Sequence, residues 1–217
     1  MLLISGFVIV FSIAAAFCLS GKFDRGLSST HKTVQAFVDD KHIKVNSQHI
    51  YSKDFFSKDL KDEYKYIEDL FLSCSDIFVV KATNNIDIKG NIKQKVVVES
   101  LIKGSAIIGD TVDIIYNGYF TKSDGYNYVG FYNQNFMQQG NKYIVFANQY
   151  SAYGKWYITI SGVMQSYFNV SNDNLYYIYN EHDFYGDGAS YEFFVDSKET
   201  GEQIRKLKDF LLKKYMN

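Results

Sequence analysis

The sequence contains no proline and only two cysteines among its 217 residues. Without proline, turns must be built from Gly, Asn, Asp and Ser, the other residue types that favour them. Cys18 lies in an apolar N-terminal run, so Cys74 has no disulfide partner if that run is removed or lies in a membrane. The folded part of the chain must then be stabilised by packing, without the cross-links common in small secreted domains.

The chain also lacks a surplus of positive charge, since its formal net charge is −1 and its pI is about 6.4. Contacts with phosphate supply much of the affinity of nucleic-acid-binding proteins, and those contacts require a basic surface. We therefore expect no nucleic-acid partner.

Charged side chains are absent from residues 1–20, which are mostly apolar. About 20 apolar residues in a helix span a bilayer core of roughly 30 Å, so this run predicts a membrane anchor. A cleaved signal peptide with Ala14-Ala15-Ala16 near its cleavage site is an alternative, and lipidation of Cys18 is another. Lys22 and Arg25 favour a cytoplasmic C-terminus, but long domains translocate largely regardless of flanking charge. We expect the folded domain to face outward at the cell membrane, or to be secreted.

Aromatic residues make up 18% of the chain, and they suit the half-buried surfaces of β-sheets. The pattern predicts a tether over 21–53, with room for a short helix and a short strand, and a folded domain over 54–217. Apolar spacings of 3 and 4 predict helices over 58–73 and 200–215. Runs rich in β-branched residues, with a turn at Asn84-Asn85, predict strands over 77–83, 92–102, 111–116, 142–148 and 156–161, and a hairpin over 165–179.

Several short motifs follow one another in an order that resembles a known family. They are Ser75-Asp76-Ile77-Phe78-Val79-Val80-Lys81-Ala82, Glu99-Ser100-Leu101-Ile102-Lys103-Gly104, Gly109-Asp110-Thr111-Val112, Gly140–Phe146 and Trp156–Thr159, followed by the segment 165–179. This order resembles the oligonucleotide/oligosaccharide-binding (OB)-like domain of the tissue inhibitors of metalloproteinases (TIMPs) and their bacterial membrane-anchored or secreted relatives. The resemblance implies a mainly β fold with flanking helices: a small OB-like barrel of five to six strands, an N-terminal transmembrane or signal helix, and a C-terminal helix.

Protease inhibition by the mechanism of that family does not carry over to this chain. The TIMP-like inhibitors act through a mature N-terminal cysteine, whose α-amino group and carbonyl chelate the zinc of the protease. Here residues 21–74 separate the apolar run from the first motif, and Cys74 has no partner. A peptidase inhibitor that acts through an exposed loop stays an alternative function.

No catalytic or metal-binding motif is evident in the sequence. The histidines His31, His42, His49 and His182 lack the spacing of metal ligands, and we expect them at the surface. The segment 180–197 is expected to be a solvated loop, because its acidic residues lack the register of a calcium site. No nucleophile motif of a hydrolase is present. We expect no metal, no cofactor and no enzyme activity, with an uncharacterised hydrolase as an alternative.

The best candidate surface is a predicted loop over 119–139, which is rich in Gly, Asn, Asp and Tyr. The candidate ligand-binding residues are Tyr119, Tyr126, Tyr128, Phe131 and Tyr132. Exposed aromatic residues on such loops contact ligands and proteins, although these rings could instead pack a small core under the loop. The sequence thus favours a membrane-tethered or secreted, non-enzymatic domain that binds a protein or a cell-wall ligand.

Overall fold

The computed structural model describes residues 31–46, 63–88, 92–116, 119–130, 135–149, 156–159, 167–171, 173–180 and 183–216. The predicted anchor or signal peptide over residues 1–20 lies outside these ranges, as does part of the predicted tether. Within the described part of the chain, no helix is long and apolar enough to span a membrane.

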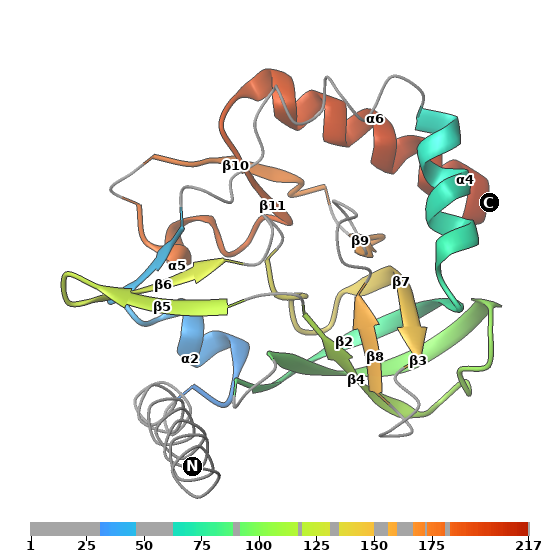
Figure 1. The fold of residues 1–217 in the computed structure, drawn as a ribbon, viewed down its shortest axis with the longest axis horizontal. Coiled ribbons are helices and arrows are strands. Elements are labelled where there is room, and N and C mark those ends of the chain that lie inside the picture. Colours follow the sequence, from blue (N-terminus) through green and yellow to red (C-terminus); the bar gives the residue numbers. More distant parts are fainter. Residues whose placement is uncertain are drawn as a thin grey trace, which may run out of the picture.

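The fold is mainly β with flanking helices and a long C-terminal helix (Figure 1). The strands are β1 (Ile43–Val45), β2 (Asp76–Asp87), β3 (Lys93–Lys103), β4 (Thr111–Ile115), β5 (Tyr119–Ser123), β6 (Tyr126–Gly130), β7 (Lys142–Gln149), β8 (Trp156–Thr159), β9 (Tyr167–Asn169), β10 (Tyr176–Ile178) and β11 (Phe193–Val195). The helices are α2 (Val34–Val38), α4 (Glu63–Ser73), α5 (Tyr185–Gly188) and α6 (Lys198–Tyr215). The prediction of a mainly β chain with a C-terminal helix is confirmed.

The largest sheet has six strands in the order β2-β3-β4-β8-β7-β9. β2 lies antiparallel to β3 on one edge and antiparallel to β7 on the other. β3 pairs antiparallel with β4, β4 pairs in parallel with β8, and β7 pairs antiparallel with β8 and β9. Hydrogen-bonded pairs thus run from β2 through β3, β4, β8 and β7 and return to β2. The closed OB-like barrel of five to six strands stays a prediction.

β2 is buried on both faces at its start, which explains its unbroken apolar sequence. Phe78 and Val80 lie in the main hydrophobic cluster, whereas Ile77 lies in a second cluster. The second cluster includes Ile204 and Leu207 of α6, so this helix covers that side of the sheet. A strand that is buried on both faces has no polar positions to alternate with its apolar ones.

Residues 119–130 form a β-hairpin, where the sequence predicted a loop. β5 and β6 pair antiparallel around Asp124 and Gly125, whose φ values are +51° and +81°. Positive φ at both central residues is typical of a type I′ turn, for which Asp-Gly is a preferred sequence. The loop prediction was wrong because it relied on the polar composition of the segment and overlooked the Asp124-Gly125 turn signal.

The predicted hairpin over 165–179 does not form. β9 pairs instead with β7, and β10 pairs in parallel with β11. Asn84 and Asn85, predicted to form a turn, lie within β2 next to an irregularity in its pairing with β3. Turn residues report local preference, whereas the partner of a strand is decided by burial and by contacts distant in sequence.

The short helix and strand expected within the tether are α2 and β1, and both pack against the main hydrophobic cluster. Phe37 of α2 and Ile43 and Val45 of β1 are buried in it. This packing places β1 beside β6, where it extends the hairpin into a three-stranded sheet in the order β1-β6-β5.

Candidate functional site

The candidate residues with described side chains lie on the sheet β1-β6-β5. β1 pairs with β6 in parallel and β5 pairs with β6 antiparallel, so β6 is the central strand. Figure 1 shows this sheet on the opposite side of the molecule from α4 and the C-terminal end.

One face of the small sheet packs on the core and the other points away from it. Val45 and Val129 are paired in register, and both are buried in the main cluster. Because side chains alternate along a strand, and residues paired in register share a face, Lys44, Tyr126 and Tyr128 lie on the opposite face. All three of these side chains are half-buried.

The ammonium of Lys44 lies beside two aromatic rings on this outward side. It lies 4.3 Å from the ring centroid of Tyr126 and 5.5 Å from that of Phe184. The centroids of the two rings are 6.2 Å apart, and a β-bridge joins the backbones of Lys44 and Phe184. Both ammonium-to-ring distances suit a cation–π interaction. Lys44, Tyr126, Tyr128 and Phe184 are together named the aromatic face.

The ammonium of Lys44 has no carboxylate partner among the residues that the structure describes. The acidic side chains on either side of Phe184 in sequence are engaged elsewhere. Asp183 accepts a hydrogen bond from the Tyr177 hydroxyl at 2.9 Å, and Asp187 accepts one from the backbone N–H of Phe184 at 2.8 Å. Among the described residues, a positive charge without a carboxylate partner therefore lies on the aromatic face.

The other candidate residues contribute less to this face. The backbone of Tyr119 pairs with Gly130 at the open end of the hairpin, and Phe131 and Tyr132 lie outside the described residues. Of the predicted set, Tyr126 and Tyr128 are brought together on one face. The alternative that rings of this segment pack a core holds for Phe136, which is 1% exposed.

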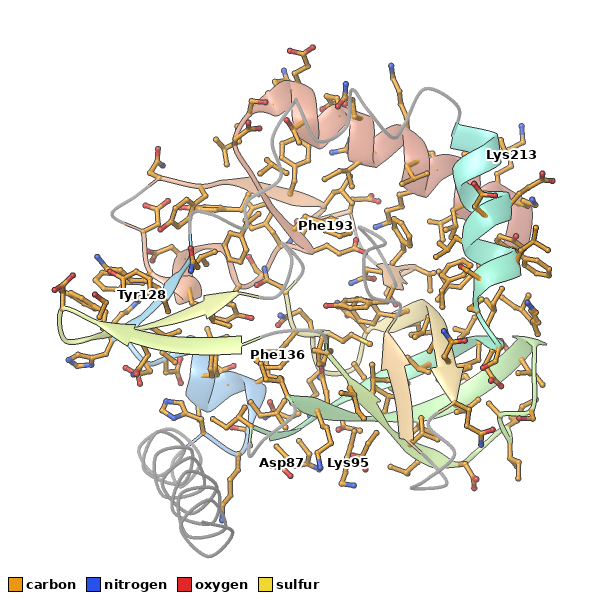
Figure 2. The ribbon with its side chains drawn as sticks, viewed as in Figure 1. Asp87, Lys95, Tyr128, Phe136, Phe193 and Lys213 are labelled. Atoms are coloured by element: carbon orange, nitrogen blue, oxygen red, sulfur yellow. The ribbon has the colours of Figure 1, made fainter. Side chains whose placement is uncertain are left out.

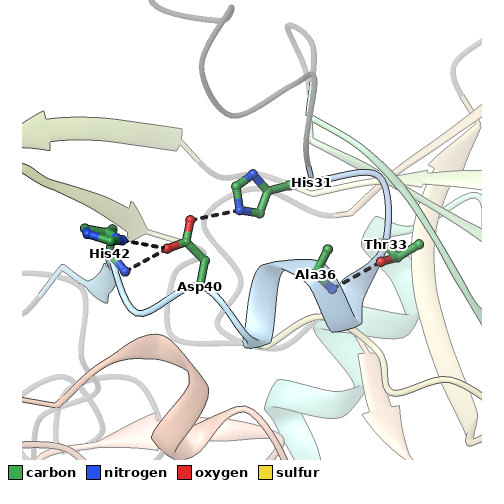
Figure 3. Close-up of polar contacts among 5 residues, drawn as sticks. All are labelled: His31, Thr33, Ala36, Asp40 and His42. Atoms are coloured by element: carbon green, nitrogen blue, oxygen red, sulfur yellow. Dashed lines mark hydrogen bonds and ion pairs between the residues drawn. The ribbon is translucent and has the colours of Figure 1, made fainter.

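A carboxylate flanked by two imidazoles lies next to the small sheet (Figure 3). Asp40 pairs with His31 Nε2 at 2.9 Å and with His42 Nδ1 at 3.2 Å. It also accepts a hydrogen bond from the backbone N–H of His42 at 2.8 Å. The carbonyl of His42 accepts a hydrogen bond from the Asn127 N–H at 2.8 Å, so this cluster abuts β6. Thr33 caps the start of α2 nearby.

These contacts correct the prediction that the histidines lie at the surface. His31 is 8% exposed, whereas His42 is exposed, and His49 and His182 lie outside the described residues. Burial raises the pKa of Asp40, but the hydrogen bonds from His42 and His31 outweigh it and hold that pKa below its ordinary value of 3.8. In the ranges that the structure describes, no group of His, Cys, Asp and Glu could hold a metal ion.

A buried ion pair lies in the segment 180–197, where the sequence predicted a solvated loop. Glu192 Oε2 lies 3.0 Å from Lys208 Nζ, and Glu192 Oε1 accepts a hydrogen bond from the Asn169 N–H at 2.5 Å. Burial raises the pKa of Glu192 to about 7, although Lys208 and the Asn169 N–H lower it. The loop prediction was wrong because β11, which follows Glu192 directly, draws the segment into the core.

Buried tyrosines hold the segment 135–138, which leads from the hairpin towards β7. The hydroxyl of Tyr167 donates a hydrogen bond to a carbonyl in this segment at 2.6 Å. The hydroxyls of Tyr185 and Tyr143 accept hydrogen bonds from N–H groups there at 3.4 Å and 2.8 Å. Burial raises the pKa of each of these tyrosines, so their hydroxyls stay neutral. These contacts help to position the hairpin against the core.

Comparison of the chain with family models, curated proteins and solved structures finds no match. The resemblance to TIMP-like domains therefore stays a prediction. What the aromatic face can do is decided by its own chemistry, in which rings provide stacking surfaces and an ammonium provides charge.

Proposed function

We propose that this chain is a membrane-tethered or secreted, non-enzymatic extracytoplasmic domain that binds a protein or a cell-wall ligand through the aromatic face. The uncharged, apolar run over residues 1–20 supports export, as an anchor or a signal peptide. The observation that carries the binding role is that Tyr126 and Tyr128 lie half-buried on one outward face beside Lys44. Tyrosine combines an apolar ring with a polar hydroxyl and is enriched in binding surfaces.

We also propose that β2, β3, β4, β8 and β7 form a small OB-like barrel. The pairings that lead from β2 through the other strands and back to it support this closure. Closure removes exposed strand edges, which otherwise invite aggregation. In such a barrel the β5–β6 hairpin belongs to the connection between β4 and β7, so a barrel loop carries the aromatic face.

Binding is tested by sedimenting the full chain, in detergent micelles, with purified cell walls, and by measuring its binding to immobilised, purified surface proteins. Replacing both Tyr126 and Tyr128 with Ala should weaken binding by at least about tenfold, because two stacking surfaces are lost. The matched double Phe variant keeps both rings and should retain most of the binding. Leu72→Ala, at a 75% exposed position on α4, is the control for a surface far from the hairpin. Unchanged binding of a folded double Ala variant would contradict the proposal.

Peptidase inhibition is the second candidate function, and one observation favours it. The hairpin tip at Ser123, Asp124 and Gly125 is exposed, and an exposed turn could enter the cleft of a peptidase. Tight inhibition of a purified extracellular peptidase that is lost on changing the tip, but kept in the double Ala variant of Tyr126 and Tyr128, would favour inhibition over the binding role above.

Export is tested separately by treating intact cells that carry a C-terminally tagged chain with protease. Removal of the tag while a cytoplasmic control protein survives would support an outward-facing domain. Protection of the tag until the cells are lysed would instead mean that Lys22 and Arg25 orient the C-terminus towards the cytoplasm.

A further inference from the structure

The aromatic face presents side chains to a ligand, and within the described residues its central strand has no unpaired edge. Its central strand, β6, is hydrogen-bonded to β1 on one side and to β5 on the other. A peptide that binds by adding a strand to a sheet needs an edge with free N–H and C=O groups. A ligand that lies on this face must therefore be held by the aromatic rings of the face and by the ammonium of Lys44.

Tyr126 and Tyr128 form a platform on this face. They are two residues apart on one strand, so their Cα atoms are separated by roughly 7 Å. The rings offer apolar surface to the C–H groups of a sugar ring, and each phenolic hydroxyl can donate or accept a hydrogen bond with sugar hydroxyls. This combination suits a carbohydrate better than a purely apolar ligand.

Lys44 adds a positive charge to the platform. Lys44 is half-buried as a residue, its ammonium lies 4.3 Å from the centroid of the Tyr126 ring, and no carboxylate in the described ranges pairs with it. The carboxylate of Asp40, three residues before the start of β1, is already shared by the imidazoles of His31 and His42. A partly desolvated ammonium attracts an anionic group more strongly than a fully hydrated one.

We propose that the aromatic face binds an acidic polysaccharide, with a sugar ring against Tyr126 and Tyr128 and its acid group on the ammonium of Lys44. The proposal rests on the proposed function, since it names the ligand class of the same face. The stacking surface and the charge act together, so a neutral sugar polymer and an acidic peptide each satisfy only part of the site.

The test measures binding of the full chain, in detergent micelles, to polygalacturonate by calorimetry. Methyl-esterified polygalacturonate has the same sugar without the charge, and polyglutamate has the charge without the sugar. The acid polymer should bind at least about tenfold more tightly than either control, because a hydrogen bond to a charged group contributes that much or more. Its affinity should fall as salt concentration rises.

Three variants connect the binding to these residues. Lys44→Met keeps an apolar stem of similar length and should reduce affinity for polygalacturonate to that of the ester, whereas Lys44→Arg should retain most of it. Lys213→Met removes the same charge from the exposed end of α6, far from Tyr128 in Figure 2, and should leave affinity unchanged. Thermal unfolding of each variant establishes that it is folded.

The possible outcomes separate this proposal from the one on which it rests. Equal binding of the acid polymer and its ester, or preference for polyglutamate, would overturn the acidic polysaccharide. Absence of polygalacturonate binding, with cell-wall or protein binding that still depends on Tyr126 and Tyr128, would overturn it and leave the proposed function standing. Loss of every Tyr-dependent interaction would overturn both.

Discussion

Two lysines that are buried to different depths have different partners for their positive charge. The side chain of Lys208 is 7% exposed and lies 3.0 Å from the carboxylate of Glu192. Lys44 is half-buried, and in the part of the chain that the structure describes its ammonium contacts two aromatic rings and no carboxylate. A charge removed from water needs an opposite charge, whereas a half-buried ammonium keeps part of its hydration and can be positioned by rings. The depth of burial thus separates Lys208, which pairs with a carboxylate in the core, from Lys44, for which we propose a ligand.

The largest expected effect is on the buried lysine. Lys208→Met leaves the Glu192 carboxylate in the core without its partner and should lower the free energy of unfolding by about 3–5 kcal/mol. Urea unfolding of the full chain, followed by the fluorescence of Trp156, measures the change. Lys213→Met, an exposed position on the same helix, is the control and should have little effect. A cost for Lys208→Met as small as that of the control would mean that the pair does not support α6.

The pH dependence of stability should report the same pair. Burial raises the pKa of Glu192 from 4.5 to about 7. Between these pH values the side chain is therefore protonated in the folded protein and ionised in the unfolded chain. The stabilising contribution of this group is therefore complete below pH 4.5 and is lost as the pH rises to about 7. Glu192→Gln cannot titrate, and it should remove a fall of about 3 kcal/mol over this range. If the unchanged chain and Glu192→Gln lost stability in parallel as the pH rises, the raised pKa of Glu192 would be contradicted.

A smaller effect is expected at Asp40, between the two imidazoles. Asp40→Asn removes the charge that pairs with His31 and His42 and should cost about 1 kcal/mol of unfolding free energy at neutral pH. Because the pKa of Asp40 is lowered in the fold, its contribution is present above pH 3.8 and is lost as the pH falls further. The difference in unfolding free energy between the unchanged chain and Asp40→Asn should therefore shrink below pH 3.8. A difference that grows there would contradict this account.

The smallest effect on stability is expected for Lys44, which completes the comparison. Lys44→Met loses the cation–π contacts with Tyr126 and Phe184, and should change the unfolding free energy by less than about 1 kcal/mol. The same urea titration measures this value. A loss as large as that expected for Lys208→Met would mean that Lys44 serves the fold, and would weaken its assignment to a ligand.

Elements with a strong local pattern could be predicted from the sequence. Ile204, Leu207 and Leu211 recur at helical spacing, and all three are buried where α6 covers the sheet. The prediction began this helix at residue 200, whereas α6 begins at Lys198 after its cap, Ser197. Such elements are predictable because the residues that decide them lie within one or two turns of each other.

Partners distant in sequence could not be predicted in this way. Glu192 was expected in water because the residues around it are polar, yet its side chain is 2% exposed. Lys208, sixteen residues further along, is the partner that makes this burial tolerable. No local pattern relates the two, since their contact exists only after β11 and α6 have packed together.

The sequence by itself determined the mainly β character of the chain and the C-terminal helix, and it singled out Tyr126 and Tyr128 as candidates, although in a predicted loop. Only the tertiary structure decided what lies beside them. Lys44 and Phe184 come from segments distant from β6 in the sequence, and the pairing of β1 with β6 brings Lys44 to Tyr126. The reason is physical: alternation along a strand is a local property of the backbone, whereas the neighbour across a sheet is selected by how the whole core packs.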